Sequence, residues 1–427
     1  MPDAPPPPDP LVPDASPPAG LAPTAVGDRE PILDVLRGFA LLGILLVNIE
    51  FMRGSQIFDA LLGFATDAPA TTADRATSFA VGWLISGKFV SAFAILFGIG
   101  AALISRRALE AGRSPRGLLA RRYGWSIGFG LAHMLLLFPG DVLFVYGVTG
   151  MVLLAFVRER PQTMLRWSAG LLVGAALLFA LLAAITGSPA VADGTSADPF
   201  TEMAMGRQQQ AVDAFTNGSY GQVVAANAFL SLLIQSGQLF FLPWFLAMFL
   251  VGFAVARLGL VQDFRARRPL LRRAAVIGLG VGLPLNLVLG VLGPLGTGAP
   301  DTPVRVLVAG AVVQIVGAPI LTVGYLAGLA LICLRWRPIR PLAATGRMAL
   351  SAYLLQSALA LAVFWGFGAY DRLGAAQALV VVAGIWVVVL AVSMLWLRVF
   401  RFGPAEWLWR SLTYGELQPF RARPSEG

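Results

Sequence analysis

The chain has very few of the residues that build metal and redox sites. Among 427 residues it has one cysteine, Cys333, and one histidine, His133. A single cysteine excludes an intramolecular disulfide and a metal centre built from cysteines. A single histidine argues against a multi-histidine metal site. We therefore expect neither a bound metal nor a bound cofactor.

Charge is also scarce, and the basic residues are almost all of one type. Only 13% of the residues are charged while 57% are hydrophobic, and all but one of the 32 basic residues are arginine, as a GC-rich bacterial genome tends to give. A membrane span needs about 20 mostly apolar residues, and the chain offers that length many times. This composition predicts an all-α polytopic protein of the bacterial cytoplasmic (inner) membrane. The net charge of +9 indicates arginines retained on one side of the bilayer rather than a nucleic-acid partner.

The apolar runs predict about ten transmembrane helices between residues 32 and 398. A stretch at 226–236, just before the sixth of them, could be re-entrant or interfacial. The ten predicted spans lie near residues 33–51, 78–104, 123–138, 141–157, 167–186, 237–256, 274–292, 304–333, 347–366 and 376–397.

Alternating charge in the connections predicts the topology. Four connections are rich in arginine and the intervening ones carry acidic residues, so the positive-inside rule places the arginine loops and both termini in the cytoplasm. Residues 1–31, with eleven prolines, predict a disordered cytoplasmic tail. Residues 187–225 form the largest predicted outer loop, and 399–427 a cytoplasmic interfacial helix and tail.

The first predicted span carries three polar residues on one face. Asp34, Arg37 and Asn48 fall near one another at 100° per residue. Asp34 and Arg37 are spaced to pair on the helix surface. A charge inside a span costs several kcal/mol unless it is paired or reaches water, so this face is predicted to line a substrate path. The alternative is that Arg37 extends to cytoplasmic headgroups and Asn48 bonds a neighbouring helix.

His133 lies near the outer end of the third predicted span, and Asp141 starts the next. Asp141 can cap that helix or reach His133 and orient its ring. A histidine backed by a carboxylate is a plausible general base, which makes both residues candidate catalytic groups. A buried histidine that is hydrogen-bonded between helices is the competing interpretation.

The ninth predicted span, in "GRMALSAYLLQS" (346–357), faintly repeats the first. It has Arg347 in its first turn, followed by Tyr353 and Gln356. These three residues join Asp34, Arg37 and Asn48 in the predicted substrate-binding set.

The stretch "FGPAEWLWRSLTYG" (402–415) reads as a short helix that begins at Pro404. Glu406 and Arg410 are spaced to form an ion pair, and the two tryptophans suit a membrane interface. By contrast, the glycines of "FGIG" (97–100) are predicted to serve close helix packing rather than phosphate binding.

Five stretches of the chain resemble the signature segments of the bacterial YeiB-like family. This is a domain-of-unknown-function group of inner-membrane proteins that are often described as possible transporters. That family is similar in turn to the transmembrane acyltransferases, such as the heparan glucosaminide acetyltransferases and the O-antigen acyltransferases. The O-antigen enzymes have a histidine late in the first span, where this chain has Asn48. The matching stretches are "LDVLRGFALLGILLVN", "KFVSAFAILFGIG", "LLFPGDVLFVYGVTGM", "GRMALSAYLLQS" and "GPAEWLWRSLTYG".

The resemblance implies a bilayer-embedded enzyme that moves an acyl group from a cytoplasmic acyl-CoA donor to a small-molecule or glycan acceptor. Asp34, Arg37 and Arg347 would form the cytoplasmic mouth that binds the donor phosphates, and His133 with Asp141 would deprotonate the acceptor hydroxyl. The same polar face could instead serve a proton-coupled transporter, and a non-catalytic membrane scaffold is a third alternative. The sequence specifies neither the substrate nor the oligomeric state.

Overall fold

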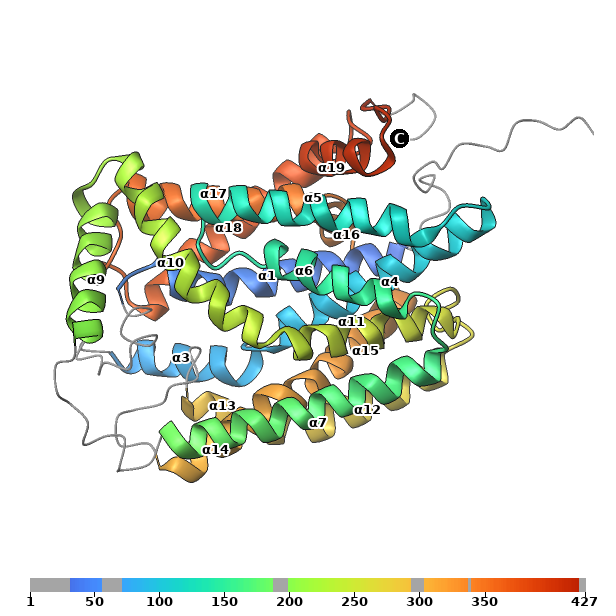
Figure 1. The fold of residues 1–427 in the computed structure, drawn as a ribbon, viewed down its shortest axis with the longest axis horizontal. Helices are drawn as coiled ribbons and strands as arrows, with labels where there is room; N and C mark the ends of the chain where they lie inside the picture. Colours follow the sequence, from blue (N-terminus) through green and yellow to red (C-terminus); the bar gives the residue numbers. More distant parts are fainter. Residues whose placement is uncertain (1–30, 56–70, 187–198, 293–302, 337–338, 422–427) are drawn as a thin grey trace, which may run out of the picture.

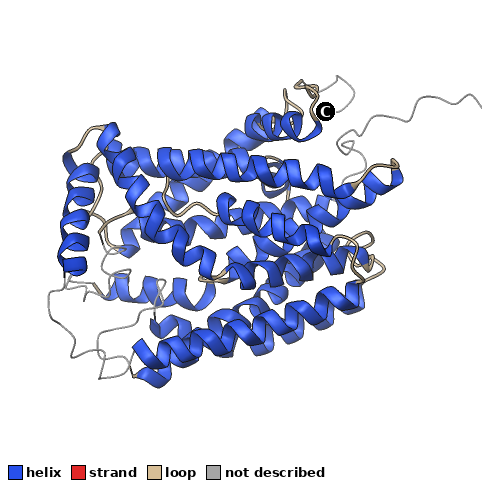
Figure 2. Cartoon of the chain, viewed as in Figure 1, coloured by secondary structure: helices blue, strands red, loops and turns tan. Residues whose placement is uncertain are grey.

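The computed structural model describes residues 31–55, 71–186, 199–292, 303–336 and 339–421. Over these residues the chain is helical (Figure 2), apart from one isolated bridge between Phe400 and Arg421. Residues 1–30 of the predicted proline-rich tail lie outside the described residues, and Pro31 is the first residue of α1. The α-helices are α1 (Pro31–Met52), α3 (Thr72–Leu84), α4 (Lys88–Glu110), α5 (Pro115–Leu136), α6 (Leu143–Leu153), α7 (Pro161–Thr186), α9 (Pro199–Asn217), α10 (Tyr220–Phe240), α11 (Leu242–Arg257), α12 (Arg268–Leu285), α13 (Leu287–Leu292), α14 (Val304–Val312), α15 (Ala318–Trp336), α16 (Arg340–Arg347), α17 (Ala349–Leu361), α18 (Ala375–Trp396) and α19 (Pro404–Tyr414).

Several of these helices are long and apolar enough to cross a membrane, which identifies a multi-pass membrane protein. Within the described residues there are seven such stretches, and two further apolar helices, Leu143–Phe156 and Leu242–Arg257, are shorter. The predicted count of ten spans is therefore not confirmed. The seven stretches are Pro31–Met52, Thr72–Glu110, Pro161–Ile185, Tyr220–Phe240, Val304–Trp336, Ala349–Gly366 and Ala375–Trp396.

Two of the predicted spans correspond to helices whose first turns are basic. Helix α5 carries Arg116, Arg121 and Arg122 near its start. Its remaining apolar part, 123–136, rises only about 21 Å, against a hydrocarbon thickness of about 30 Å. Helix α12 likewise begins with three arginines. Both helices are part of the bundle, but neither has the length and composition of an independent span.

The region around the sixth predicted span is organised differently from the expectation. Residues 226–236 lie inside the continuous helix α10, and the chain bends at Phe241 before α11 begins, with Pro243 in its first turn. The expected span 237–256 is thus divided between two helices. The expected outer loop 187–225 contains helix α9 and the first turns of α10.

Two other expected spans are interrupted. The span at 78–104 is split between α3 and α4 at residues 85–87, where Gly87 takes a left-handed backbone with φ 79°. The span at 347–366 begins only at α17, because the helix breaks at Met348. Arg347 therefore lies in the last turn of α16, and not in the first turn of a span as predicted. Two π-helical turns also occur, η3 (Val313–Gly317) and η4 (Ala362–Gly366).

Helix α1 runs through the middle of the bundle, α9 stands across one end, and α19 lies along one side, next to α5 (Figure 1). Helix α1 packs against α4, α16, α17 and α18. Its Gly38 approaches the backbone of α16 so closely that a Cβ atom there would overlap the Leu342 carbonyl. Close packing also explains Gly98 of "FGIG", which lies against the backbone of Phe249 on α11, as predicted. Helix α1 is therefore surrounded by other helices of the protein.

Candidate functional site

The first polar pair of α1 forms as predicted. Arg37 Nη1 lies 2.9 Å from Asp34 Oδ1. Asp34 is buried and Arg37 is about a third exposed, with a side-chain exposure of 30%. Both residues line a cavity. The pair therefore provides one fixed charge-neutral wall of that cavity.

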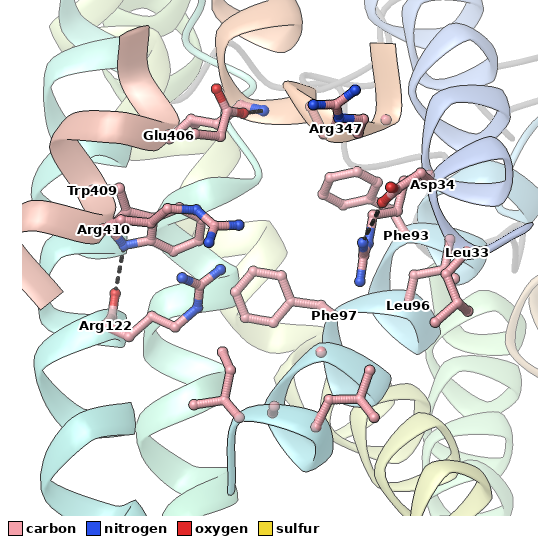
Figure 3. A pocket seen from close by; sticks show the side chains of 18 of the residues that line it. Leu33, Asp34, Phe93, Leu96, Phe97, Arg122, Arg347, Glu406, Trp409 and Arg410 are labelled. Carbon is pink, nitrogen blue, oxygen red and sulfur yellow. Dashed lines mark hydrogen bonds and ion pairs between the residues drawn. The ribbon is translucent and has the colours of Figure 1, made fainter. Parts of the chain in front are cut away.

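This cavity encloses about 530 Å³ at the end of the bundle where α1 begins. Figure 3 shows the guanidinium groups of Arg122 and Arg410 pointing into its central space, with Arg347 and Asp34 across from them. Six arginines against two carboxylates give the walls a formal excess of four positive charges. The charged residues of its lining are Arg37, Arg106, Arg107, Arg122, Arg347, Arg410, Asp34 and Glu406.

One arginine of the cavity has an unused donor. The Nε atom of Arg347 is buried and has no hydrogen-bond partner among the described residues. It lies just before the helix break at Met348. A buried guanidinium N–H without an acceptor is costly, so an anionic group in the cavity would be stabilised there.

Helix α19 is part of the cavity wall. Trp409 stacks on Arg122, whose guanidinium carbon is 3.6 Å from the ring centroid, and Trp409 Nε1 donates to the Arg122 carbonyl at 2.9 Å. Arg410, the next residue in the chain, also lines the cavity. Burial, and secondarily the charge of Arg122, lower the pKa of Arg410 to about 10. This guanidinium therefore stays charged at neutral pH.

The predicted Glu406–Arg410 ion pair is wrong, since none is present between these two described residues. The Glu406 carboxylate instead accepts hydrogen bonds from the backbone N–H groups of Leu350 and Ser351 and from the Ser351 hydroxyl. It thereby caps the first turn of α17, whose N–H groups have no intrahelical partner. Burial raises the pKa of Glu406.

The His133–Asp141 pair also forms, and Asp141 serves both predicted purposes. His133 Nδ1 lies 2.8 Å from Asp141 Oδ1, while Asp141 Oδ2 accepts the Phe144 N–H at 2.7 Å. Both side chains are fully buried. The structure thus orients the histidine ring but also encloses it.

His133 lines neither the arginine cavity nor the smaller cavity beside it. Its Nε2 atom is buried and has no hydrogen-bond partner among the described residues. Tyr353, which lines the arginine cavity, packs its ring on the imidazole with centroids 4.7 Å apart. The base candidate is therefore close to the cavity but has no opening into it.

A second cavity, of about 280 Å³, adjoins the first. The side chains of Ile44 and Val142 line both. Its polar groups are neutral, namely Ser86, Asn48 and the glutamines Gln238 and Gln314, and six aromatic side chains complete its walls. Asn48 thus faces a different cavity from Asp34 and Arg37.

The structure divides the predicted substrate set in two. Asp34, Arg37, Arg347 and Tyr353 line the arginine cavity and Asn48 lines the second. Gln356 is buried and lines neither.

Sequence reasoning assigned no site role to Arg122, Glu406, Trp409 or Arg410. The local signal for the last three was their placement in one short amphipathic helix, but only the tertiary contacts bring that helix to the cavity.

Comparison with known proteins identifies relatives of the chain, but the names of these relatives state no function. Residues 255–416 match a family described as "Protein of unknown function (DUF418)". The "Uncharacterized protein YxaH" of Bacillus subtilis is 30% identical over 420 residues, covering 94% of this chain and 98% of its own length. The "Uncharacterized protein YeiB" of Escherichia coli is 29% identical over 408 residues, covering 93% and 100%. No solved structure matches the chain.

Proposed function

The chain belongs to the DUF418 family, and from the geometry of its arginine cavity we propose that it is an acyltransferase of the bacterial inner membrane. The donor is an acyl-CoA whose phosphates bind the cavity arginines, and the acceptor is a hydroxyl-bearing envelope molecule that enters the second cavity. The observation that carries this proposal is the convergence of six arginines on one cavity.

The arginine cavity suits a donor with several phosphates. Guanidinium groups bind phosphate oxygens in bidentate geometry, and charge-assisted hydrogen bonds are about twice as strong as neutral ones. The volume of about 530 Å³ is in the range of about 300–1,000 Å³ that is usual for small-molecule and cofactor sites. Arg347 Nε, which is buried without an acceptor, supplies a donor that such a ligand would satisfy.

The two cavities would divide donor from acceptor. The acceptor hydroxyl oxygen attacks the thioester carbonyl, a C–O bond forms, the C–S bond breaks, and the hydroxyl proton passes to a base while the CoA thiolate leaves and takes up a proton. Ile44 and Val142, which line both cavities, lie where the reacting groups would meet. For His133 to be the base, Tyr353 must move, because the imidazole is enclosed.

Binding of CoA to the purified protein tests the donor site directly. Arg347→Gln should weaken CoA binding about tenfold to a hundredfold, the loss of one charged hydrogen bond of about 1.5–3 kcal/mol. Arg160→Gln is the matched control, since Arg160 is exposed and outside the cavity. Wild-type protein that releases free thiol from acetyl-CoA only when an envelope extract is present supports transfer. Absence of CoA binding at millimolar concentration would refute the proposal.

A proton-coupled transporter is the second candidate, favoured by one specific arrangement. The second cavity is lined by Gly87, in the α3–α4 interruption, and by Gln314, in the π-helical turn η3, whose side-chain amide lies against Gly87. Interrupted helices at a central cavity are typical of transporters. Solute uptake into proteoliposomes driven by a pH gradient, without thiol release from acetyl-CoA, would favour this alternative.

A further inference from the structure

A groove between the arginine ends of α12 and α15 is separate from both cavities. It encloses about 810 Å³. The two helices touch at backbone level where Gly278 faces Gly324, since a Cβ atom on either glycine would overlap the other helix. Toward the start of α12 the larger side chains of the two helices line the groove. The lining residues are Arg268, Pro269, Arg272, Arg273, Val276, Ile277, Leu331, Ile332, Arg335 and Trp336.

The groove has a charged end and an apolar wall. Its four arginines are all exposed, and no acidic residue lines it. Within the described residues none of the four arginines forms an ion pair. Further along α12 from these arginines, the side chains of Val276 and Ile277 are 65% and 61% exposed. Trp336, at the end of a span-length helix, is 71% exposed, as suits a membrane interface.

We propose that this groove is a binding site for cardiolipin, an anionic phospholipid with two phosphates and four acyl chains. Basic pockets between transmembrane helices bind such headgroups. Four guanidinium groups without a neutralising carboxylate match two phosphates better than the single phosphate of phosphatidylglycerol. The exposed apolar wall beside them receives the acyl chains. The site does not depend on the activity proposed for the cavities.

The simplest competing explanation is that these arginines only orient the chain in the membrane. The neighbouring loop supplies a matched control, because Arg265 and Arg267 are also exposed but do not line the groove. Removing two charges from either place changes the net charge by the same amount. A cardiolipin site predicts unequal consequences, whereas diffuse attraction predicts equal ones.

The test is a titration of delipidated full-length protein with cardiolipin or phosphatidylglycerol, followed by native mass spectrometry. The wild type should bind cardiolipin more tightly than phosphatidylglycerol. The double variant Arg272→Gln/Arg273→Gln should lose roughly tenfold or more in cardiolipin affinity, given the usual contribution of a basic residue at an anionic surface. Arg265→Gln/Arg267→Gln should bind as the wild type does. Equal affinity for both lipids, or equal losses in the two double variants, overturns the proposal.

A second variant keeps the test decisive if the arginine variant does not fold. Ile277→Trp fills the apolar wall and retains all four arginines, on a side chain that is already exposed. It should also weaken cardiolipin binding, with an unchanged elution volume on size exclusion. Unaltered binding in Ile277→Trp shows that acyl chains do not occupy the groove and contradicts the site as described.

Discussion

Trp409 lies against Arg122 through two contacts at once, a ring face 3.6 Å from the guanidinium carbon and an indole N–H that donates to the carbonyl of the same residue. The two contacts join α19 to α5, helices that begin 289 positions apart in the chain. They make the C-terminal helix a wall of the arginine cavity rather than a separate interfacial element.

Replacing Trp409 should therefore loosen α19. Trp409→Leu removes the cation–π contact and one hydrogen bond, and we expect the stability of the folded protein to fall by about 1–3 kcal/mol. Thermal unfolding in detergent measures this. Trp407→Leu is the control, because its indole bonds only Gln418, within the C-terminal segment. A larger loss in the Trp407 variant would contradict the assigned role of Trp409.

Glu406 should control the charge of the cavity through its protonation. Glu406→Gln keeps an oxygen acceptor for the α17 N–H groups but removes one negative charge, so anion affinity should rise a few-fold, on the order of 1 kcal/mol. Glu406→Ala loses the cap and should be less stable than Glu406→Gln. Calorimetric titration with inorganic pyrophosphate, beside thermal unfolding, separates the two effects.

The same residue predicts a pH dependence. Because burial raises the pKa of Glu406 in the folded protein, the folded state binds its proton more tightly than the unfolded state does. The contribution of this group to stability is therefore largest at low pH and is lost as pH rises through the folded pKa. Pyrophosphate affinity should also increase as pH falls through that range. Glu406→Gln should lack both effects, and an identical pH profile in that variant would exclude Glu406 as their source.

Asp34 and Arg37 should be energetically coupled. Asp34→Asn or Arg37→Gln leaves a charge in a mostly buried position, so the double variant should lose less than the sum of the singles, with a coupling of about 1–3 kcal/mol. The exposed pair Arg106–Glu110, at 3.5 Å, is the comparison and should show less than about 1 kcal/mol. Strict additivity at positions 34 and 37 would show that this contact contributes nothing.

His133 can be tested without breaking its bond to Asp141. His133→Asn places a side-chain N–H near the position of Nδ1 and removes Nε2, so we expect a folded protein that has lost acyl transfer. His133→Leu leaves a buried carboxylate without its partner and should destabilise the fold by several kcal/mol. Thiol release from acetyl-CoA and thermal unfolding measure the two properties. Full activity in His133→Asn would make the residue a structural histidine.

The orientation in the membrane remains a prediction from the arginine loops. In a Cys333→Ala background, Asn217→Cys should react with an impermeant maleimide in intact cells, whereas Arg265→Cys should react only after the cells are broken open. Both positions are exposed in the structure. Reaction of the Arg265→Cys variant in intact cells would reverse the assigned topology.

Short-range spacing predicted two of the three expected pairs correctly and failed for Glu406–Arg410, where long-range contacts decided the outcome. Asp34 and Arg37 are three residues apart, and His133 and Asp141 flank one tight turn, so local geometry was sufficient for both. The hydrogen-bond partners of Glu406 lie on α17, more than fifty residues upstream. Helical periodicity relates only residues within one helix, so it could not predict this contact. The break at Met348 was not predicted either, and neither was the close packing of Gly346 against the Asp34 carbonyl of α1.

The layer formed by Ile44 and Val142 has an electrical consequence. If the two cavities open to opposite sides of the membrane and both fill with water, the insulating part of the protein shrinks to the layer that contains these two side chains, and most of the membrane voltage falls across it. A charge that crosses only this layer would then exchange nearly the full energy of the field, about 2.3 kcal/mol per elementary charge at 100 mV. In that arrangement the width of two aliphatic side chains would set how well the protein keeps ions from leaking across its membrane.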